Sequence, residues 1–479
     1  MSKQALSRLK IAVLSLTLLV IWAGATSAQP QTEKTARASR YFESVRNSPP
    51  QLLAFLLQMP KGADLHNHLS GAIYAESYIQ WAADSGDCIN TTTMYASLPP
   101  CANGQVPIAN ALASGTLYRQ IIDAWSMRNW KLSGQSGHDH FFDTFGKFGV
   151  ATYNQSGKML AEAVARAARG HVLYLELMLT PDGTSTGVLS SQIGDKVGWD
   201  GNPQRTLEKL KSNGIDAAVP LTIKNLTDQE AEKDRILKCG TAEADPGCSV
   251  VIRYIAQVAR ASALGPVFAQ MVTGFALAND PSSRIVALNL VQAEDGLSSM
   301  QNFSVQMRML QFLRSQYPRA HLSLHAGELA PGIVPPDGLS FHIRDSVMVA
   351  QANRIGHGVD IMHEKDAEGL LQEMAKRNVL VEICLTSNDV ILGISGPHHP
   401  LATYLKFGVP VALATDDEGV SRSEISREYL RAVEDQKLDY LQLKAMARNS
   451  IEYAFIEESE KAKLKSKLEE QFREFEKKW

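Results

Sequence analysis

The stretch Met59–Ala72, MPKGADLHNHLSGA, decides the fold because it places two histidines, His66 and His68, at the end of the first candidate strand. Side chains two residues apart on a β-strand point to the same face, so His66 and His68 suit one metal ion. Such pairs also occur by chance, and we interpret His138 and His140 as a pair of that kind in a loop or at a helix start. The first pair therefore needs support from other strands.

Short apolar or β-branched runs alternate with amphipathic segments along the chain, which is typical of a parallel sheet or barrel with crossover helices. The candidate strands are Ala63–Leu69, Val172–Leu179, Ile215–Ile223, Arg284–Val291, His321–His325, Asn353–His357, Val379–Leu385 and Val409–Thr415. Helices are predicted at Lys158–Arg169, Ser304–Ser315, Asp366–Arg377 and Pro400–Phe407, and Ser423–Trp479 is predicted to be nearly continuous helix. Eight strands, each followed by a helical segment, predict an α/β fold, the (β/α)8 TIM barrel.

Polar residues end several of these strands. The fifth strand ends in His325 and is followed by Glu328, the sixth ends in His357 between two glycines, and the eighth is followed by Asp416 and Asp417. The carboxyl ends of barrel strands converge on one pocket, so these side chains are expected to meet. Three histidines and a carboxylate suit zinc with an open position for water, and a further His and Glu remain for proton transfer. We interpret His342, His363 and His398 as loop or surface histidines.

The composition is that of a globular chain with material for a large core. Of 479 residues, 44% are hydrophobic and 21% are charged, which excludes a disordered chain. The 48 basic and 51 acidic residues give a net charge of −3, without the basic surplus that nucleic-acid binding requires. We therefore expect a small-molecule partner and no nucleic acid.

The first residues have the form of a secretory signal peptide. Lys3, Arg8 and Lys10 precede the apolar run Ile11–Trp22, and small residues follow as far as Ala28. The predicted organisation is a signal peptide at 1–28, a helical lead-in at 29–58 and a barrel at 59–479 with insertions at about 70–170 and 224–283. The mature protein is expected to be exported, either periplasmic or secreted, without a membrane segment.

Two close cysteine pairs agree with an oxidising compartment. Cys88 with Cys101 and Cys239 with Cys248 lie in loop-like sequence and are natural disulfides, although unrelated thiols are the alternative. Cys384 lies in an apolar run and is interpreted as a buried thiol. The insertion at 70–170 is expected to add helices over the barrel mouth, as either a lid or a dimer surface, which leaves a homodimer open.

The motifs in their order resemble the adenosine deaminase family of metal-dependent hydrolase barrels, particularly its exported, growth-factor-like branch. With the opening stretch, the resemblance rests on SLHAGE (323–328), NRIGHGVDI (353–361), EICLTSN (382–388), HPLATYLKFGVPVALATDD (399–417) and LKAMARNSIEYAFIEESEKAKL (443–464). It implies one Zn²⁺ ion per chain, held by His66, His68, His325 and Asp416. The implied reaction is deamination of adenosine or deoxyadenosine to inosine or deoxyinosine, with release of ammonia.

The resemblance also implies roles for the neighbouring groups. Glu328 donates a proton to the purine ring nitrogen N1 while oxygen attacks C6. His357 orients the water and helps to deprotonate it, and Asp416 also contacts the water. Asp417 hydrogen-bonds the purine.

Two departures bear on the substrate. Ser70 stands where the family commonly has an aspartate that reaches the ribose, and Gln292 or Ala293 stands where a glycine commonly lines the purine pocket. One alternative is therefore a deaminase of a different aminopurine or nucleoside analogue. Another is an extracellular nucleoside-binding or signalling protein, which would be expected to have lost Glu328 or a zinc ligand; the sequence keeps them all.

Overall fold

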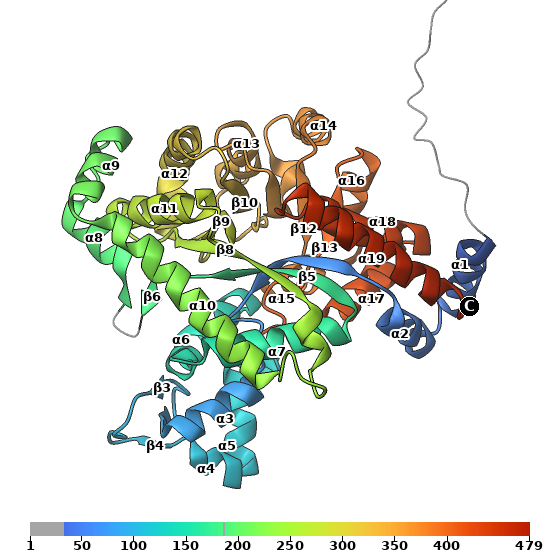
Figure 1. The fold of residues 1–479 in the computed structure, drawn as a ribbon, viewed down its shortest axis with the longest axis horizontal. Coiled ribbons are helices and arrows are strands. Elements are labelled where there is room, and N and C mark those ends of the chain that lie inside the picture. Colours follow the sequence, from blue (N-terminus) through green and yellow to red (C-terminus); the bar gives the residue numbers. More distant parts are fainter. Residues whose placement is uncertain (1–32, 185–186) are drawn as a thin grey trace, which may run out of the picture.

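The computed structural model describes residues 33–184 and 187–479, so the predicted signal peptide lies outside the described residues. Within these ranges, one eight-stranded parallel sheet follows the chain order (Figure 1). Its strands are β1 (Gly62–His68), β5 (Val172–Leu179), β8 (Val251–Ala259), β9 (Ile285–Val291), β10 (His321–Ala326), β11 (Arg354–His357), β12 (Leu380–Ile383) and β13 (Val411–Leu413). A bridge between Asn67 and Asp416 joins the last strand to the first. The predicted (β/α)8 barrel is confirmed.

Helices cover the outside of the barrel. They are α7 (Ser156–Arg169), α8 (Leu189–Val197), α9 (Pro203–Ser212), α10 (Ala218–Ile236), α11 (Leu264–Asn279), α12 (Leu297–Gln316), α13 (His342–Met348), α14 (Ala367–Arg377), α15 (Leu385–Leu392) and α16 (Leu401–Lys406). Amphipathic spacing explains their packing: Leu160 and Val164, four residues apart on α7, are both buried.

The prediction of a third strand at Ile215–Ile223 is wrong. Residues Ile215–Ala217 form a 3₁₀ turn and the rest of the segment begins α10, whose buried residues Ala218, Thr222 and Leu226 repeat every fourth position. The third strand is β8, so a large part of the segment 224–283 belongs to the barrel itself. The β-branched content of 215–223 indicated a strand, but the spacing of its apolar residues is helical.

The predicted continuous helix at the C-terminal end is divided into α17 (Ile425–Gln436), α18 (Tyr440–Glu452) and α19 (Glu458–Glu476). Lys437 has a left-handed backbone at φ 60° that ends α17, and Asp439 starts α18 with a capping box. Before the barrel, α1 (Glu33–Val45) and α2 (Pro49–Gln58) lie near this C-terminal end (Figure 1), where Tyr41 stacks on Trp479 with ring centroids 4.2 Å apart.

The segment after β1 forms a lobe that projects from the barrel (Figure 1). It contains α3 (Ala75–Ser85), a small sheet of β2 (Cys88–Asn90), β3 (Ala96–Ser97) and β4 (Gln105–Pro107), and the helices α4 (Ala109–Ala113), α5 (Gly115–Ala124) and α6 (Gly137–Phe148). A short hairpin, β6 (Gly183–Thr184) and β7 (Gly187–Val188), follows β5. Disulfides join Cys88 to Cys101 and Cys239 to Cys248, and Cys384 is a buried free thiol. No helix within the described residues is long and apolar enough to cross a membrane.

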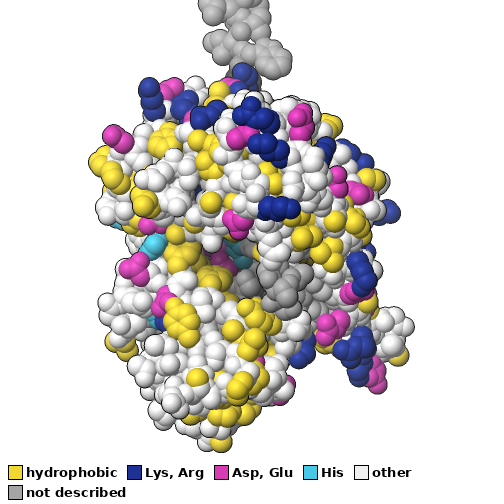
Figure 2. Space-filling model, turned by 90° about the vertical axis from the view of Figure 1, so that its left-hand side faces the viewer, with side chains coloured by type: hydrophobic (Ala, Val, Ile, Leu, Met, Phe, Trp, Pro, Cys, Tyr) yellow, Lys and Arg dark blue, Asp and Glu magenta, His cyan; other side chains and the backbone are white. Residues whose placement is uncertain are grey.

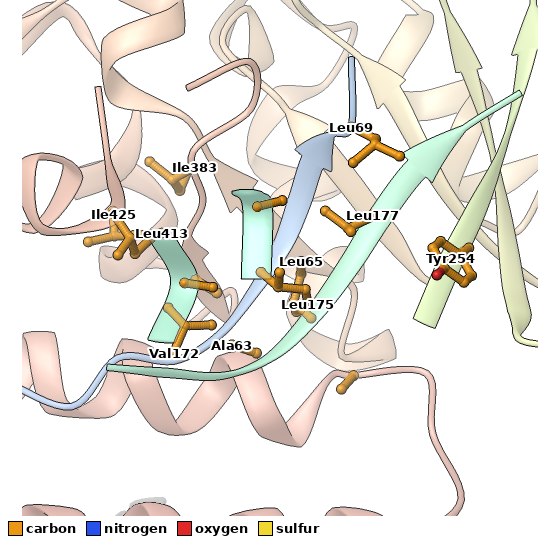
Figure 3. Close-up of a cluster of buried hydrophobic side chains, with 14 of the residues drawn as sticks. Ala63, Leu65, Leu69, Val172, Leu175, Leu177, Tyr254, Ile383, Leu413 and Ile425 are labelled. Carbon is orange, nitrogen blue, oxygen red and sulfur yellow. The ribbon is translucent and has the colours of Figure 1, made fainter. Parts of the chain in front are cut away.

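Side chains of β1 alternate between a face that packs in the hydrophobic core and a face that carries the histidines. Ala63 and Leu65 are fully buried, and Leu65 lies beside Leu175 of β5 in the hydrophobic cluster drawn in Figure 3. Because successive side chains on a strand point to opposite faces, His66 and His68 occupy the other face, inside the barrel.

Candidate functional site

Four ligand atoms from three strand ends converge inside the barrel. Nε2 of His66 and Nε2 of His68 lie 3.2 and 3.3 Å from Nε2 of His325. Oδ1 of Asp416 lies 3.5 and 3.4 Å from the Nε2 atoms of His66 and His68. The structure therefore brings together the four residues that the sequence analysis named as metal ligands.

The spacing of these atoms fits a metal ion. Zinc–nitrogen and zinc–oxygen bonds are about 2.0–2.2 Å long, and the corners of a tetrahedron of that size are roughly 3.3–3.6 Å apart. The four separations given above, 3.2 to 3.5 Å, are close to those edges. The donor set of three imidazoles and one carboxylate is also one that zinc takes.

The other ring nitrogen of each histidine has its own partner. Nδ1 of His66 donates to Oε2 of Glu382 at 2.7 Å, and Nδ1 of His325 donates to Oδ1 of Asn289 at 2.8 Å. Nδ1 of His68 lies 2.6 Å from the side-chain amide of Gln257. Such partners turn all three Nε2 atoms toward the common point, as in known metal sites.

The charges at this point favour a cation. Burial opposes a charge on His66, but hydrogen bonds to Asp416 and Glu382 outweigh it and raise the pKa of His66 to about 10. Burial also opposes ionisation of Asp416, yet His66 and the neighbouring histidines hold its pKa well below the usual range. An ionised carboxylate in a buried pocket of imidazoles is costly unless positive charge accompanies it.

A buried ion-pair network supports the His66 side from within the barrel. Arg354 contacts Glu176 and Glu382 at 2.5 Å each, and all three side chains are fully buried. Despite burial, Arg354 and His66 hold the pKa of Glu382 at about 2, so Glu382 accepts from His66 as a carboxylate. The position of the His66 ring, a candidate metal ligand, therefore depends on an arginine at the start of β11.

Glu328 stands next to the ligand cluster. Its Oε1 lies 3.7 Å from Nε2 of His357. Burial, together with the negative charges of Asp416 and Glu294, raises the pKa of Glu328 well above the ordinary carboxyl value. This shift favours the protonated form of Glu328, which can donate a proton.

His357 lies between glycines because its neighbours approach closely. A Cβ at Gly356 would lie 2.6 Å from Cε1 of His66, and one at Gly358 would lie 2.4 Å from the hydroxyl of Tyr404. The His357 backbone itself has a left-handed φ of 71°. Its Nδ1 meets Nδ2 of Asn388 at 3.0 Å, and its ring packs 4.9 Å from that of His66, between centroids.

Asp417 follows Asp416 in the chain, but its carboxyl group lies against Gly71. A Cβ at Gly71 would lie 1.5 Å from Oδ1 of Asp417, so the carboxyl group occupies the space that only glycine leaves. Burial and the charge of Asp416 raise the pKa of Asp417 well above the ordinary value. Asp417 is thus a buried carboxyl group at the carboxyl end of the barrel, and its surroundings favour the protonated form.

The other three residues predicted to contact the substrate do not form one cluster as the candidate metal ligands do. Ser70 lies in the turn after β1, where its carbonyl accepts from the hydroxyl of Tyr78. Gln292 has a left-handed φ of 79°, and its Oε1 accepts the N–H of Ala261 at 3.0 Å. Ala293 uses its carbonyl to accept from Ser299 at the start of α12. The Gln292 amide is therefore tied to the loop after β8 and not to the ligand cluster.

The sequence analysis missed the groups that hold this site. They are Gln257, Asn289, Glu294, Glu382, Asn388 and His399. A carboxylate inside the apolar run Val379–Leu385 was an available signal for Glu382. His342 was interpreted as a loop or surface residue, which is wrong: it is fully buried, with Nδ1 2.5 Å from Oε1 of Glu294. His138 and His140 lie in the first turn of α6, away from the cluster.

Cavities around the described part of the barrel do not coincide with the ligand cluster. One of about 1260 Å³ opens between the first residues of β8 to β11, at the end of the barrel opposite the ligand cluster. A smaller one of about 470 Å³ lies where His138 meets Asp295 at 2.9 Å. Figure 2 shows a hollow in one face with acidic and histidine side chains at its base. Because catalytic groups of barrels lie at the carboxyl ends of strands, cavity size does not decide the site here.

Comparison with known proteins gives a family match. A family model described as adenosine deaminase matches residues 204–471. An adenosine deaminase from Yersinia pseudotuberculosis is 34% identical over 158 residues, which are 33% of this chain and 44% of that protein. The chain spans about half the length of the curated relatives it matches.

Solved structures match over most of the chain. Adenine deaminase from Arthrobacter aurescens has a TM-score of 0.57 at 18% identity, covering 86% of this chain and 99% of that one. An amidohydrolase from Burkholderia ambifaria with bound Zn has a TM-score of 0.56 at 17% identity, covering 88% and 93%. At these identities the likeness supports the fold.

Proposed function

We propose an activity for this chain from one premise: it belongs to the adenosine deaminase family. The activity is hydrolytic deamination of a purine nucleoside, adenosine or deoxyadenosine, to the inosine form and ammonia. The observation that carries it is the convergence of four ligand atoms, 3.2 to 3.5 Å apart, beside a carboxyl group whose pKa is raised.

We propose one zinc ion, held by His66, His68, His325 and Asp416. Support comes from the donor set, the tetrahedral spacing and the bound Zn in the Burkholderia ambifaria structure. Zinc lowers the pKa of water to roughly 7, which supplies a nucleophile at neutral pH. The remaining steps belong to side chains of this chain.

Glu328 supplies the proton that the ring needs. Attack of the water oxygen at C6 pushes electrons onto the ring nitrogen N1, and the protonated carboxyl of Glu328 donates its proton there. A C–O bond forms first; the C–N bond then breaks, and the amino group leaves as ammonia after taking a proton from the attacking oxygen. One water is consumed for each ammonia released.

Asp417 recognises the base. Its raised pKa favours the protonated carboxyl, whose hydroxyl can donate to a second ring nitrogen of the purine. Gly71 gives this carboxyl its room. Together, Asp417 and Gly71 would select for a base that offers an aromatic nitrogen as acceptor.

The alternative function is deamination of a different aminopurine or nucleoside analogue. Two observations favour keeping it. The side chain of Ser70 offers no carboxylate for a ribose, and Gln292 or Ala293 stands where the family commonly has a glycine, with Oε1 of Gln292 accepting the N–H of Ala261. Sites built to hydrogen-bond a hydroxyl discriminate by roughly 10⁴ or more, so losing such a partner changes the substrate profile. A nucleoside-binding or signalling protein without turnover is the third candidate.

We also propose export to the periplasm or the medium. The charged, apolar and small-residue order of residues 1–28 supports it, and two disulfides fit an oxidising compartment. Amino-terminal sequencing of the secreted or periplasmic protein is the test. A first residue of Gln29 is expected, and an intact Met1 in the cytoplasm would contradict export.

The decisive experiment is the ultraviolet spectrum of adenosine incubated with zinc-loaded protein and, in parallel, with chelator-treated protein. A change to the inosine spectrum that chelation abolishes is expected. Deoxyadenosine, adenine and AMP are run beside it. Turnover of adenine or AMP alone favours the alternative substrate, and stoichiometric zinc without turnover of any of them contradicts the deaminase proposal.

A further inference from the structure

A buried chain of hydrogen bonds runs behind His357 and starts at a backbone amide. The N–H of Leu401 donates to Nδ1 of His399 at 3.2 Å. A backbone N–H has no lone pair to offer, so Nδ1 of His399 is an acceptor and the ring carries its proton on Nε2. Burial, strengthened by the nearby charge of Arg431, lowers the pKa of His399 to about 4, which keeps the ring neutral.

This starting point fixes the orientation of Asn388. Nε2–H of His399 donates to Oδ1 of Asn388 at 3.0 Å. The amide oxygen therefore faces His399, and the NH₂ group faces His357, with Nδ2 3.0 Å from Nδ1 of His357. An NH₂ group only donates, so Nδ1 of His357 accepts. The proton of the neutral His357 ring must then lie on Nε2.

The geometry at the other end of His357 gives this proton a destination. Nε2 is buried and has no hydrogen-bond partner among the described residues. It faces Glu328 across 3.7 Å, next to the ligand cluster. A donor left without a partner in a buried position points to a ligand atom that accepts from it.

We propose that Asn388 and His399 are positioning residues that hold His357 as the Nε2–H tautomer, so that His357 donates a hydrogen bond to the attacking oxygen. This inference rests on the proposed function and deepens it. It also replaces one role that the family resemblance implies, because a nitrogen that already carries a proton cannot deprotonate water.

The tautomer also simplifies the proton accounting. His357 gives up no proton and receives none, so the same hydrogen bond can hold the oxygen while it attacks C6 and while ammonia leaves. Of the two protons of the water, one passes to solvent, which a zinc ion at this site would favour, and the other leaves with ammonia. Glu328 regains from solvent the proton that it gives to N1. Fixing the ring in advance removes the cost of reorienting it during the reaction.

The tautomer of His357 can be determined by ¹⁵N NMR in the absence of substrate. Protein is prepared with histidine labelled by ¹⁵N only at Nδ1, and the resonance of His357 is identified by its loss in His357→Gln. Protonated and unprotonated ring nitrogens have well-separated shifts. An unprotonated Nδ1 in the zinc-loaded protein is expected, and a protonated Nδ1 would overturn the proposal.

Two variants of the chain of hydrogen bonds test its direction. Asn388→Asp keeps the shape but offers only acceptors, so Nδ1 of His357 should become protonated. We expect kcat to fall by about 10² or more with KM little changed, the size of effect typical for a misplaced proton. His399→Gln keeps an N–H donor toward Asn388 and should retain the wild-type Nδ1 signal and most of the activity.

The outcomes separate this inference from the proposed function. A protonated Nδ1 in Asn388→Asp with unchanged kcat overturns the catalytic role of the tautomer. If wild-type protein deaminates no purine, the proposed function fails, while the Nδ1 resonance still decides the tautomer. If the Nδ1 resonance of His357 moves to the protonated position in His399→Gln, the proposed direction of the chain of hydrogen bonds is wrong.

Discussion

Glu294 holds the backbone of Glu328. Oε2 of Glu294 accepts the N–H of Glu328 at 2.8 Å, and Oε1 accepts the N–H of Gly327 at 3.0 Å. On its other side Glu294 contacts Nδ1 of His342 at 2.5 Å. The same carboxylate thus positions the proposed proton donor and adds negative charge beside it.

We predict that Glu294→Gln shifts the pH dependence of the reaction. The pKa of Glu328 is raised first by burial and then by Asp416 and Glu294. Its protonated form is present below that pKa and lost as pH rises through it. Removing the Glu294 charge lowers this pKa, so the alkaline limb of the pH profile of kcat/KM should move to lower pH. The surface variant Glu373→Gln is the control, and an unmoved limb in Glu294→Gln would argue against the coupling.

Glu328→Gln should separate metal binding from turnover. The amide keeps the shape but has no acidic proton, so we expect a loss of about 10² to 10⁴ in kcat. Zinc content should stay at the wild-type level, because Glu328 is not among the four ligands. Metal analysis and the adenosine assay on the same preparation test both statements, and wild-type turnover would remove Glu328 from the mechanism.

His325→Ala should abolish stable metal binding. The variant removes one of the four proposed ligand atoms and also the imidazole that donates to Oδ1 of Asn289. A ligand that binds only the folded state raises Tm, so added zinc should raise the Tm of the wild type and not that of His325→Ala. His138→Ala, outside the cluster, is the matched control. Full zinc occupancy in His325→Ala would contradict the ligand assignment.

Gly71→Ala should damage substrate recognition through Asp417. The added methyl would lie 1.5 Å from Oδ1 of Asp417, so this buried carboxyl group must move. We expect a higher KM and a lower kcat with zinc retained. Gly149→Ala, whose Cβ meets nothing within 4 Å, serves as the control for a glycine replacement. Kinetics equal to the wild type would show that Asp417 does not need its present position.

Arg354→Met should unfold more easily. It leaves Glu176 and Glu382 as buried carboxylates without their cation, and removing one partner of a buried pair costs about 3–5 kcal/mol. Urea denaturation measures the loss, and the exposed Arg205→Met, whose ion pair with Asp200 faces solvent, should change stability little. A loss no greater than that of the control would show that the network is not needed for stability.

Sequence patterns predicted the strand ends well for a physical reason. A buried strand shows a compact apolar run, and a histidine or carboxylate at its end stands out against that run, as at His325, His357 and Asp416. The third strand was not predicted because β8 carries Arg253 and Gln257 among its apolar residues. The segment Ile215–Ile223 is rich in β-branched residues but is helical.

The supporting groups could not be predicted in the same way. Asn289 and Gln257 are polar residues within strands, and nothing local shows which histidine they meet. His342 looks like a loop residue until α13 brings it against Glu294. These three contacts join residues 36, 189 and 48 positions apart along the chain, so only the closed barrel defines them.

The bridge from Asn67 to Asp416 has a consequence for biosynthesis. His66 and His68 are made early, but Asp416 lies just beyond the last strand, so the complete set of candidate ligands exists only after residue 416 has been synthesised. A partly folded chain presents at most the histidines, which would hold a metal ion less tightly than the full set. Loading of the proposed site with metal would therefore follow closure of the barrel and report that the barrel has folded.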